Sequence, residues 1–375
     1  MKHKKLAAAV VTGTFCATLV LFSCSKSDKN DDSQGGGNQS DTVLVNLGAN
    51  VISPAFNQLA TATAGLETVV TAFTNFPTSG SLLAMKNAFK DAYKAWEGVS
   101  AYQFGPMLDQ SLTTHFTNSF PADTAIIKSN IAGASYTMDG LGNFAAQGFP
   151  ALDYLLFAYN DNYVMARFTT DANATGAKNY LKALAGALKT KAAAVANAWS
   201  ATGGNYVDKF SKATGVDAGS SLSQLLNAFV QDFDVTLQNY KIGIPIGKYG
   251  PNTLPISPEK VEAYYSGYSV ALLIAQLQAI QTMYLGGNGG GIDDKVAATT
   301  AKNNGLPLND AIKNQINTLL AKLQTLQDPL SAAVQNNITT VNDTYTEVRK
   351  LTVLLKADMS SALGVKISFQ DDDGD

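Results

Sequence analysis

Apolar residues recur at every third or fourth position over long stretches of this 375-residue chain. One such stretch runs from Leu82 to Val99 and another from Val334 to Leu355. This spacing puts the apolar side chains on one face of an α-helix, and that face must be buried. Strand-like alternation of apolar and polar residues is nearly absent. The pattern predicts an all-α protein of packed helical bundles. We expect helices near residues 52–75, 81–103, 123–133, 149–159, 172–201, 219–240, 258–285, 308–328 and 330–361.

The first residues predict an exported, lipid-anchored protein. Three lysines precede an apolar run from Leu6 to Val20, which is too short for a membrane span. The sequence Leu-Phe-Ser-Cys that ends at Cys24 resembles a bacterial lipoprotein cleavage box, so Cys24 is the expected acylated residue. Residues 1–23 are then a signal peptide, and residues 24–41 a flexible tether without large apolar side chains. We expect attachment to the outer membrane, facing the periplasm or the cell surface; an ordinary secretory signal is the alternative.

The length that remains predicts two domains. About 330 residues exceed what a single hydrophobic core usually organises. Residues 242–257 are rich in glycine and proline and predict a long irregular crossing after the helix near 219–240. We therefore assign residues 42–240 to an N-terminal helical-bundle domain and residues 241–375 to a C-terminal one.

Composition excludes several classes of function. The formal net charge is −3, and removal of the predicted signal peptide with its three lysines makes it about −6. The chain has two arginines, Arg167 and Arg349, so nucleic acid is a poor partner. Outside the signal peptide it has a single histidine, His115, and the only cysteine is Cys24. Histidine-ligated zinc and a cysteine–histidine nucleophile are therefore improbable, and we expect His115 on a loop or helix surface.

Residues 148–153, Gly-Phe-Pro-Ala-Leu-Asp, resemble the Gly-x-His-x-x-Glu signature of the imelysin family, bacterial envelope proteins linked to iron uptake and also classed as peptidases. Pro150 stands at the histidine position and Asp153 at the glutamate position. Further stretches similar to the family, in the same order, are residues 96–106, 241–249, 261–269, 284–287 and 363–375. The resemblance implies two helical bundles with a cleft between them. The exchange of histidine for proline removes a metal ligand and a general base.

Six polar residues are the candidate ligand-binding set. In a helix, Glu262, Ser266 and Ser269 would share one face, because they are four and three positions apart. That face could line the cleft or face solvent. Asp153 either faces the ligand or merely favours the start of its helix. The predicted ligand-binding residues are Glu97, Asp153, Glu262, Tyr265, Ser266 and Ser269, with Asp153 and Glu262 as metal ligands.

The leading hypothesis is a protein that binds an iron-related or other small ligand, such as iron or another divalent or trivalent cation, and acts in envelope iron acquisition with an uptake partner protein. The iron link follows from the resemblance alone. No catalytic residue is assigned. One alternative is a metallopeptidase that uses Asp153 or Glu262 to activate a metal-bound water. The other is a surface module that binds a protein or glycan partner.

Overall fold

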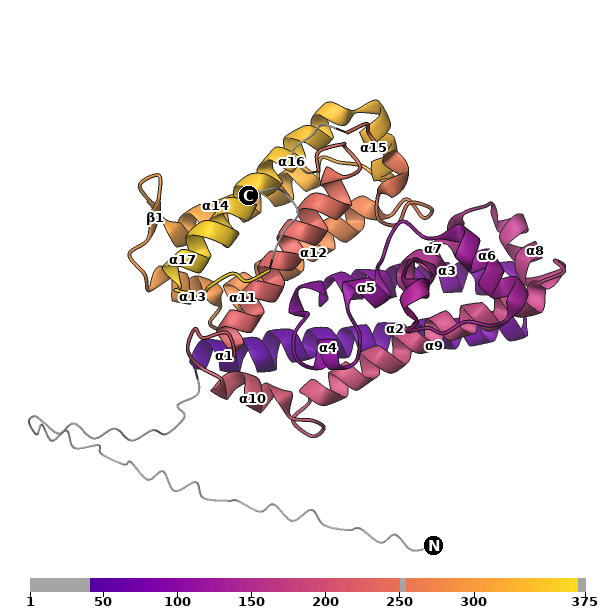
Figure 1. Ribbon diagram of the computed structural model, residues 1–375, viewed down its shortest axis with the longest axis horizontal. Coiled ribbons are helices and arrows are strands. Elements are labelled where there is room, and N and C mark those ends of the chain that lie inside the picture. Colours follow the sequence, from indigo (N-terminus) through magenta and orange to yellow (C-terminus); the bar gives the residue numbers. More distant parts are fainter. Residues whose placement is uncertain (1–40, 250–253, 370–375) are drawn as a thin grey trace, which may run out of the picture. The chain divides into compact units, whose positions relative to one another are not determined.

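The computed structural model describes residues 41–249 and 254–369 (Figure 1). The predicted signal peptide, Cys24, the tether up to residue 40 and the acidic tail after Phe369 lie outside the described residues. The described residues form one compact unit. The unit is helical, as predicted, and its only strands in the described part are β1 (Lys302–Asn303) and β2 (Leu306–Pro307), which pair as an antiparallel hairpin. None of the described helices is both long and apolar enough to cross a bilayer.

Three long helices organise the first half of the unit. A continuous helix begins after Asp41, whose carboxylate accepts the N–H groups of Val43 and Leu44, and it runs to Asn75. Its last part, α2, packs between α3 and α9. The helices of this half are α1 (Thr42–Asn46), η1 (Leu47–Ile52), α2 (Ser53–Asn75), α3 (Ser79–Glu97), η2 (Ser100–Tyr102), α4 (Pro106–Asp109), α5 (Thr114–Thr117), α6 (Thr124–Gly133), η3 (Leu141–Ala146), α7 (Gly148–Phe157), α8 (Asp161–Thr169), α9 (Ala174–Trp199) and α10 (Tyr206–Lys212).

The second half is built around α12, α14 and α16. Helix α16 packs against α14 and against η4, a π-helical segment that continues α11 without a break. The described helices of this half are α11 (Ser221–Gln231), η4 (Asp232–Gly243), η5 (Pro258–Lys260), α12 (Ser269–Leu285), α13 (Ile292–Ala297), α14 (Leu308–Leu323), α15 (Leu330–Asn336), α16 (Ile338–Val353), η6 (Leu354–Met359) and α17 (Ser360–Ala362). The predicted boundary between residues 240 and 241 falls inside η4; the division into two domains stays a prediction.

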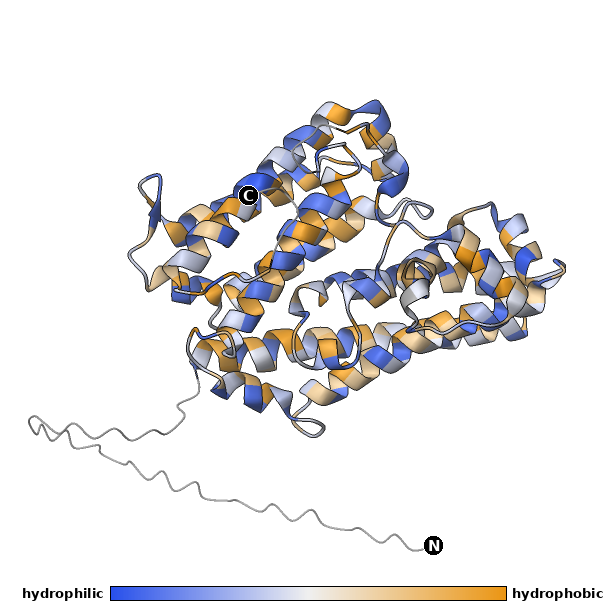
Figure 2. Cartoon of the chain, in the orientation of Figure 1, coloured by the Kyte–Doolittle hydropathy of each residue, from blue (hydrophilic) through white to orange (hydrophobic). Residues whose placement is uncertain are grey.

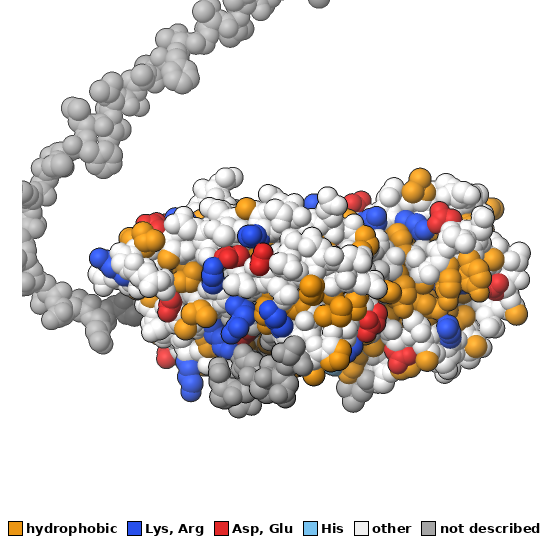
Figure 3. Space-filling view, turned by 90° about the horizontal axis from the view of Figure 1, so that it is seen from above, with side chains coloured by type: hydrophobic (Ala, Val, Ile, Leu, Met, Phe, Trp, Pro, Cys, Tyr) orange, Lys and Arg blue, Asp and Glu red, His pale blue; other side chains and the backbone are white. Residues whose placement is uncertain are grey.

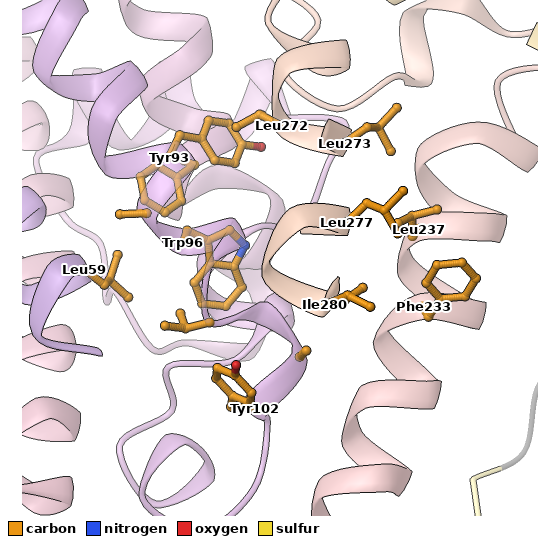
Figure 4. Close-up of a cluster of buried hydrophobic side chains, with 14 of the residues drawn as sticks. Leu59, Tyr93, Trp96, Tyr102, Phe233, Leu237, Leu272, Leu273, Leu277 and Ile280 are labelled. Atoms are coloured by element: carbon orange, nitrogen blue, oxygen red, sulfur yellow. The ribbon is translucent and has the colours of Figure 1, made fainter. Parts of the chain in front are cut away.

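One hydrophobic core connects the two halves. Helix α12 packs on α3; Leu272 of α12 lies beside Tyr93 of α3, and Leu277, on the other side of α12, lies beside Leu237 of η4 (Figure 4). Trp96 is 1% exposed, as expected for the apolar face of the stretch from Leu82 to Val99. Apolar stripes of the helices turn toward one another and polar residues gather on the outer faces (Figure 2). On the face in Figure 3, hydrophobic, basic and acidic side chains are interspersed.

Two helix predictions were wrong next to predicted ligand-binding residues. Helix α3 ends at Glu97, before residue 103, and short turns follow it. The helix predicted to start at residue 258 starts at Ser269, because Ala263 and Gly267 have φ values of +50° and +60°, which a right-handed helix does not allow. Helix α8 was not predicted. His115 is exposed on the short helix α5, as expected.

Candidate functional site

A buried lysine joins two buried glutamates at the contact between the two halves. Glu97 is the last residue of α3, Lys241 lies near the end of η4, and Glu262 lies in the segment before α12. The Lys241 Nζ atom is 2.6 Å from Glu97 Oε2 and 2.9 Å from Glu262 Oε2. The side chains of all three are at most 1% exposed. An ammonium in this position compensates the charge of a carboxylate that water cannot reach.

Burial and mutual repulsion set the proton affinities of this triad. Burial raises the pKa of Glu97 well above its ordinary value, the neighbouring Glu262 raises it further, and Lys241 opposes both. Burial alone would lower the pKa of Lys241, but the two carboxylates hold it above its ordinary value. The lysine therefore stays charged, and Glu97 can keep a proton.

Asn118 and Tyr93 extend the triad toward the first half. The Asn118 Nδ2 atom donates to Glu262 Oε1 at 2.6 Å, and the Tyr93 hydroxyl donates to Asn118 Oδ1 at 2.5 Å. The Tyr93 ring stacks on Phe149 of α7, with centroids 4.5 Å apart. Burial, followed by the charge of Glu262, raises the pKa of Tyr93, so its hydroxyl remains a hydrogen-bond donor at neutral pH.

Asp153 fastens the segment before α12 to α7. Its two carboxylate oxygens accept the backbone N–H groups of Tyr265, at 2.9 Å, and Ser266, at 3.0 Å. Asp153 is 2% exposed, and burial raises its pKa to about 6, although these hydrogen bonds act in the opposite direction. Neither interpretation of Asp153 from the sequence included this role, since no sequence pattern links residue 153 with residues 265 and 266.

The start of α7 is set by a close backbone approach. Gly148 has a φ of +64°, and a Cβ atom there would lie 2.1 Å from the carbonyl oxygen of Thr117. Only glycine fits this position. Pro150 follows in the first helical turn, where its missing N–H leaves no hydrogen bond unmade. The glycine of the motif thus has a structural cause that is independent of any ligand.

The three other predicted residues lie in or directly after the same segment. The Ser269 hydroxyl donates to the Glu262 carbonyl oxygen, and the Ser266 hydroxyl donates to the Ala263 carbonyl oxygen at 3.3 Å. The Tyr265 ring packs edge-on against Tyr154, with centroids 5.3 Å apart. The structure therefore brings the six residues together in two groups, Glu97 with Glu262 and Ser269, and Asp153 with Tyr265 and Ser266. It does so by a turn, where we had predicted a shared helical face.

Sequence reasoning missed Lys241 and Asp232 as members of this cluster. Asp232 Oδ2 accepts from the Ser100 hydroxyl at 2.9 Å and from Gln276 Nε2 at 2.7 Å. Burial raises its pKa, while Lys241 opposes the shift. A signal was present: Asp232, Asp234 and Lys241 are the charged residues in the stretch from Leu225 to Ile242, whose other residues are apolar or uncharged, and a charge that is buried in such a helix is costly unless it is paired. In the described part of the chain, the cluster holds four buried carboxyl groups and one ammonium.

The cluster does not fit a resident metal ion. Among the described residues, no three His, Cys, Asp or Glu side chains are grouped closely enough to hold one. The Lys241 ammonium occupies the position between Glu97 and Glu262 that a cation would need. Both oxygens of Asp153 are taken by backbone N–H groups. Metal binding by Asp153 and Glu262 stays a prediction, and these contacts weigh against it.

Comparisons with known proteins agree with the helical fold. The sequence model of the family described as Imelysin matches residues 52–355. A crystal structure described as an iron-regulated protein A precursor from Parabacteroides distasonis aligns with a TM-score of 0.68 at 16% identity, covering 88% of this chain and 97% of that one. An imelysin-like protein from Psychrobacter arcticum aligns with a TM-score of 0.64 at 20% identity, covering 87% and 96%. No curated protein sequence matches the chain.

Proposed function

Because the chain belongs to the imelysin family, whose sequence model matches residues 52–355, we propose that it is a lipid-anchored protein of the bacterial envelope that binds a small iron-related ligand in iron acquisition and does not turn it over. The export and lipid attachment rest on the sequence that ends at Cys24. The link with iron rests on the family and on a structural neighbour described as iron-regulated. An uptake protein of the envelope would then be the partner that receives the ligand.

One observation supports binding over catalysis: the protein itself already occupies the carboxylates near the motif. Asp153 accepts two backbone N–H groups, and Lys241 lies between Glu97 and Glu262. All of these groups are at most 2% exposed. A general base must come within hydrogen-bond reach of its substrate. Pro150 cannot replace the histidine of the family signature, because its side chain has no proton-accepting atom.

The segment of residues 261–268 is the element that we expect to contact the ligand. It is not helical, it contains Ala263 at a φ of +50°, and Asp153 ties it to α7. It also presents Tyr264, which is 41% exposed, and the half-buried Tyr265 at the surface. In this proposal Glu97, Asp153, Glu262, Ser266 and Ser269 support the segment from inside, and Tyr265 touches the ligand.

The test is ligand retention by residues 39–375, which contain the compact unit. The protein is purified without added metal and measured by native mass spectrometry and elemental analysis, before and after addition of ferric citrate or haem. We expect stoichiometric uptake of one of these probes, and its loss in Asp153→Ala and Glu262→Ala. Asp208→Ala, at an exposed ion pair with Lys212, is the matched control and should bind as the wild type does. An unaltered affinity in both cluster variants would contradict the site.

Other outcomes would replace the proposal. Cleavage of an unfolded protein substrate that is abolished both by a chelator and by Asp153→Ala would establish a peptidase. A purified protein that neither contains nor takes up iron, ferric citrate or haem would refute the iron-binding function.

A further inference from the structure

A second candidate site lies in the first half of the protein, on elements that do not carry the lysine–glutamate triad. A pocket of about 390 Å³ opens between α6, the end of α7, α8 and the start of α9. Its volume is in the range of pockets that bind small molecules. The pocket contains Arg167, one of only two arginines in the chain. Neither the proposed function nor the motif at residues 148–153 makes use of this pocket.

Two backbone carbonyl oxygens hold the guanidinium of Arg167 in place and leave some of its N–H donors free. Its Nη1 atom donates to the carbonyl oxygens of Leu155, at 2.6 Å, and Tyr154, at 3.4 Å. Its carbon atom Cζ lies 5.1 Å from the ring centre of Tyr154 and 5.3 Å from that of Tyr159. Within the described part of the chain, Arg167 has no carboxylate partner, and its Nε and Nη2 atoms make no hydrogen bond. A fixed guanidinium with free donors suits a carboxylate, which can accept two parallel hydrogen bonds.

Exposed tyrosines give the pocket a flat apolar wall. Tyr159 is 42% exposed and Tyr163 is 55% exposed, and their ring centres are 4.6 Å apart at an interplanar angle of 32°. Tyr154 lines the floor and is 4% exposed. Burial raises its pKa to about 12, so its hydroxyl is neutral near pH 7. Such rings stack against the flat face of another ring at little entropic cost, since tyrosine has few rotatable bonds.

The charged residues that line the pocket favour an anionic ligand. Lys128 on α6 lines the pocket and has no hydrogen-bond or ion-pair partner among the residues that the structure describes. Asp171 supplies a single negative charge against the two positive ones. The pocket is therefore positive on a chain whose formal net charge is −3. This difference attracts small anions to the pocket rather than to the surface in general.

We propose that this pocket binds a small molecule with a carboxylate attached to a six-membered ring, one face of which can pack on a tyrosine. The carboxylate pairs with Arg167 and Lys128, and the ring lies on Tyr159 and Tyr163. Two kinds of compound have this chemistry, aromatic acids and acidic sugars. The inference depends on the pocket alone and does not require the iron-binding function.

Isothermal titration calorimetry on residues 39–375 tests the proposal with benzoate and glucuronate as acidic probes, and with benzamide and glucose as their uncharged counterparts. We expect saturable binding of at least one acid, and binding about tenfold weaker for its uncharged counterpart. Binding of benzoate alone identifies an aromatic acid, and binding of glucuronate alone identifies an acidic sugar. Binding of neither acid, or equal binding of the uncharged counterparts, overturns the proposal.

Two variants connect the binding with the pocket. Arg167→Lys keeps the charge but loses the planar fork, and it should weaken binding about tenfold. Arg349→Lys, at the exposed second arginine on α16, is the matched control and should bind like the wild type. Because Arg167 also holds two carbonyl groups, Tyr163→Ala at an exposed position provides a second variant that is expected to fold normally. Undiminished binding in both Arg167→Lys and Tyr163→Ala would overturn the assignment to this pocket.

Discussion

Replacement of Lys241 by methionine tests whether the buried triad depends on its ammonium. Methionine is similar in length but uncharged, so one more carboxyl group has to take up a proton in the folded state. That proton costs about 3.7 kcal/mol at pH 7 and about 1 kcal/mol at pH 5, at 1.36 kcal/mol for each pH unit above an ordinary glutamate pKa. This cost agrees with the loss of about 3–5 kcal/mol that is typical when one partner of a buried ion pair is removed. We therefore expect Lys241→Met to destabilise the protein by about 3–5 kcal/mol at pH 7.

The measurement is urea unfolding at pH 7 and pH 5, followed by the fluorescence of the two buried tryptophans, Trp96 and Trp199. The loss of stability should shrink by about 2.7 kcal/mol between the two pH values. Addition of Glu262→Gln to Lys241→Met should restore most of the stability at pH 7, since it removes the carboxyl that lost its partner. Lys212→Met, which breaks an exposed pair with Asp208, should cost less than about 0.5 kcal/mol. A cost for Lys241→Met below about 1 kcal/mol at pH 7, or an equal cost at both pH values, would refute the reasoning.

Three further changes test the surroundings of the triad. Burial raises the pKa of Asp153 from 3.8 to about 6, so between these pH values the folded state holds a proton that the unfolded state has released. This proton stabilises the wild type at low pH and is lost as the pH rises through 6. In urea unfolding, the stability of the wild type relative to Asp153→Asn should therefore fall by up to about 3 kcal/mol from pH 4 to pH 7. Gly148→Ala should lower the free energy of unfolding by about 2–4 kcal/mol, because the new Cβ atom meets the Thr117 carbonyl oxygen at a positive φ. Its control is Gly186→Ala within α9, where no atom lies near the new Cβ. In the same assay this change should stabilise the protein by about 0.5–1 kcal/mol. Asp328→Ala removes the carboxylate that accepts the first N–H groups of α12, from Val270 and Ala271, and should lower the thermal midpoint in calorimetry by the equivalent of about 1–2 kcal/mol.

The helices were predictable because each is specified by residues that are close in sequence. Apolar spacing located α2, α6, α7 and α9 within a few residues. The start of α12 was misplaced because it depends on a distant partner: Asp328 caps the helix from 58 residues away. The residues before it, including Ala263, adopt a turn that Asp153 holds from α7. Contacts of this kind leave no periodic pattern in the sequence.

The same distinction between local sequence and distant contacts explains which residues of the candidate site were predicted. The motif indicated Asp153, and the spacing of Glu262, Ser266 and Ser269 marked a segment that the structure joins to Asp153, although by a turn and not by a helical face. Lys241 was missed as a site residue because it directly follows the helix predicted at residues 219–240, and apolar spacing carries no information about its distant partners. Its partners, Glu97 and Glu262, come from two other segments, and only the packing of α3, η4 and the segment before α12 brings them to one point.

The charge balance of the cluster suggests how the interior and the surface segment influence each other. Glu97, Asp153, Asp232 and Glu262 are buried with Lys241 as the only ammonium that pairs with any of them in the described part of the chain. Burial raises the pKa values of Glu97, Asp153 and Asp232, so protons supply part of the remaining compensation. Protonation of Asp153 weakens its hold on the N–H groups of Tyr265 and Ser266, because a neutral carboxyl accepts hydrogen bonds less strongly. A ligand that binds to residues 261–268 and prefers them fastened must then favour the ionised form of Asp153. Its affinity should consequently fall as the pH decreases through about 6. A titration of any bound probe between pH 5 and pH 8 would detect this coupling, and an affinity that is constant over that range would show that the segment and the cluster act independently.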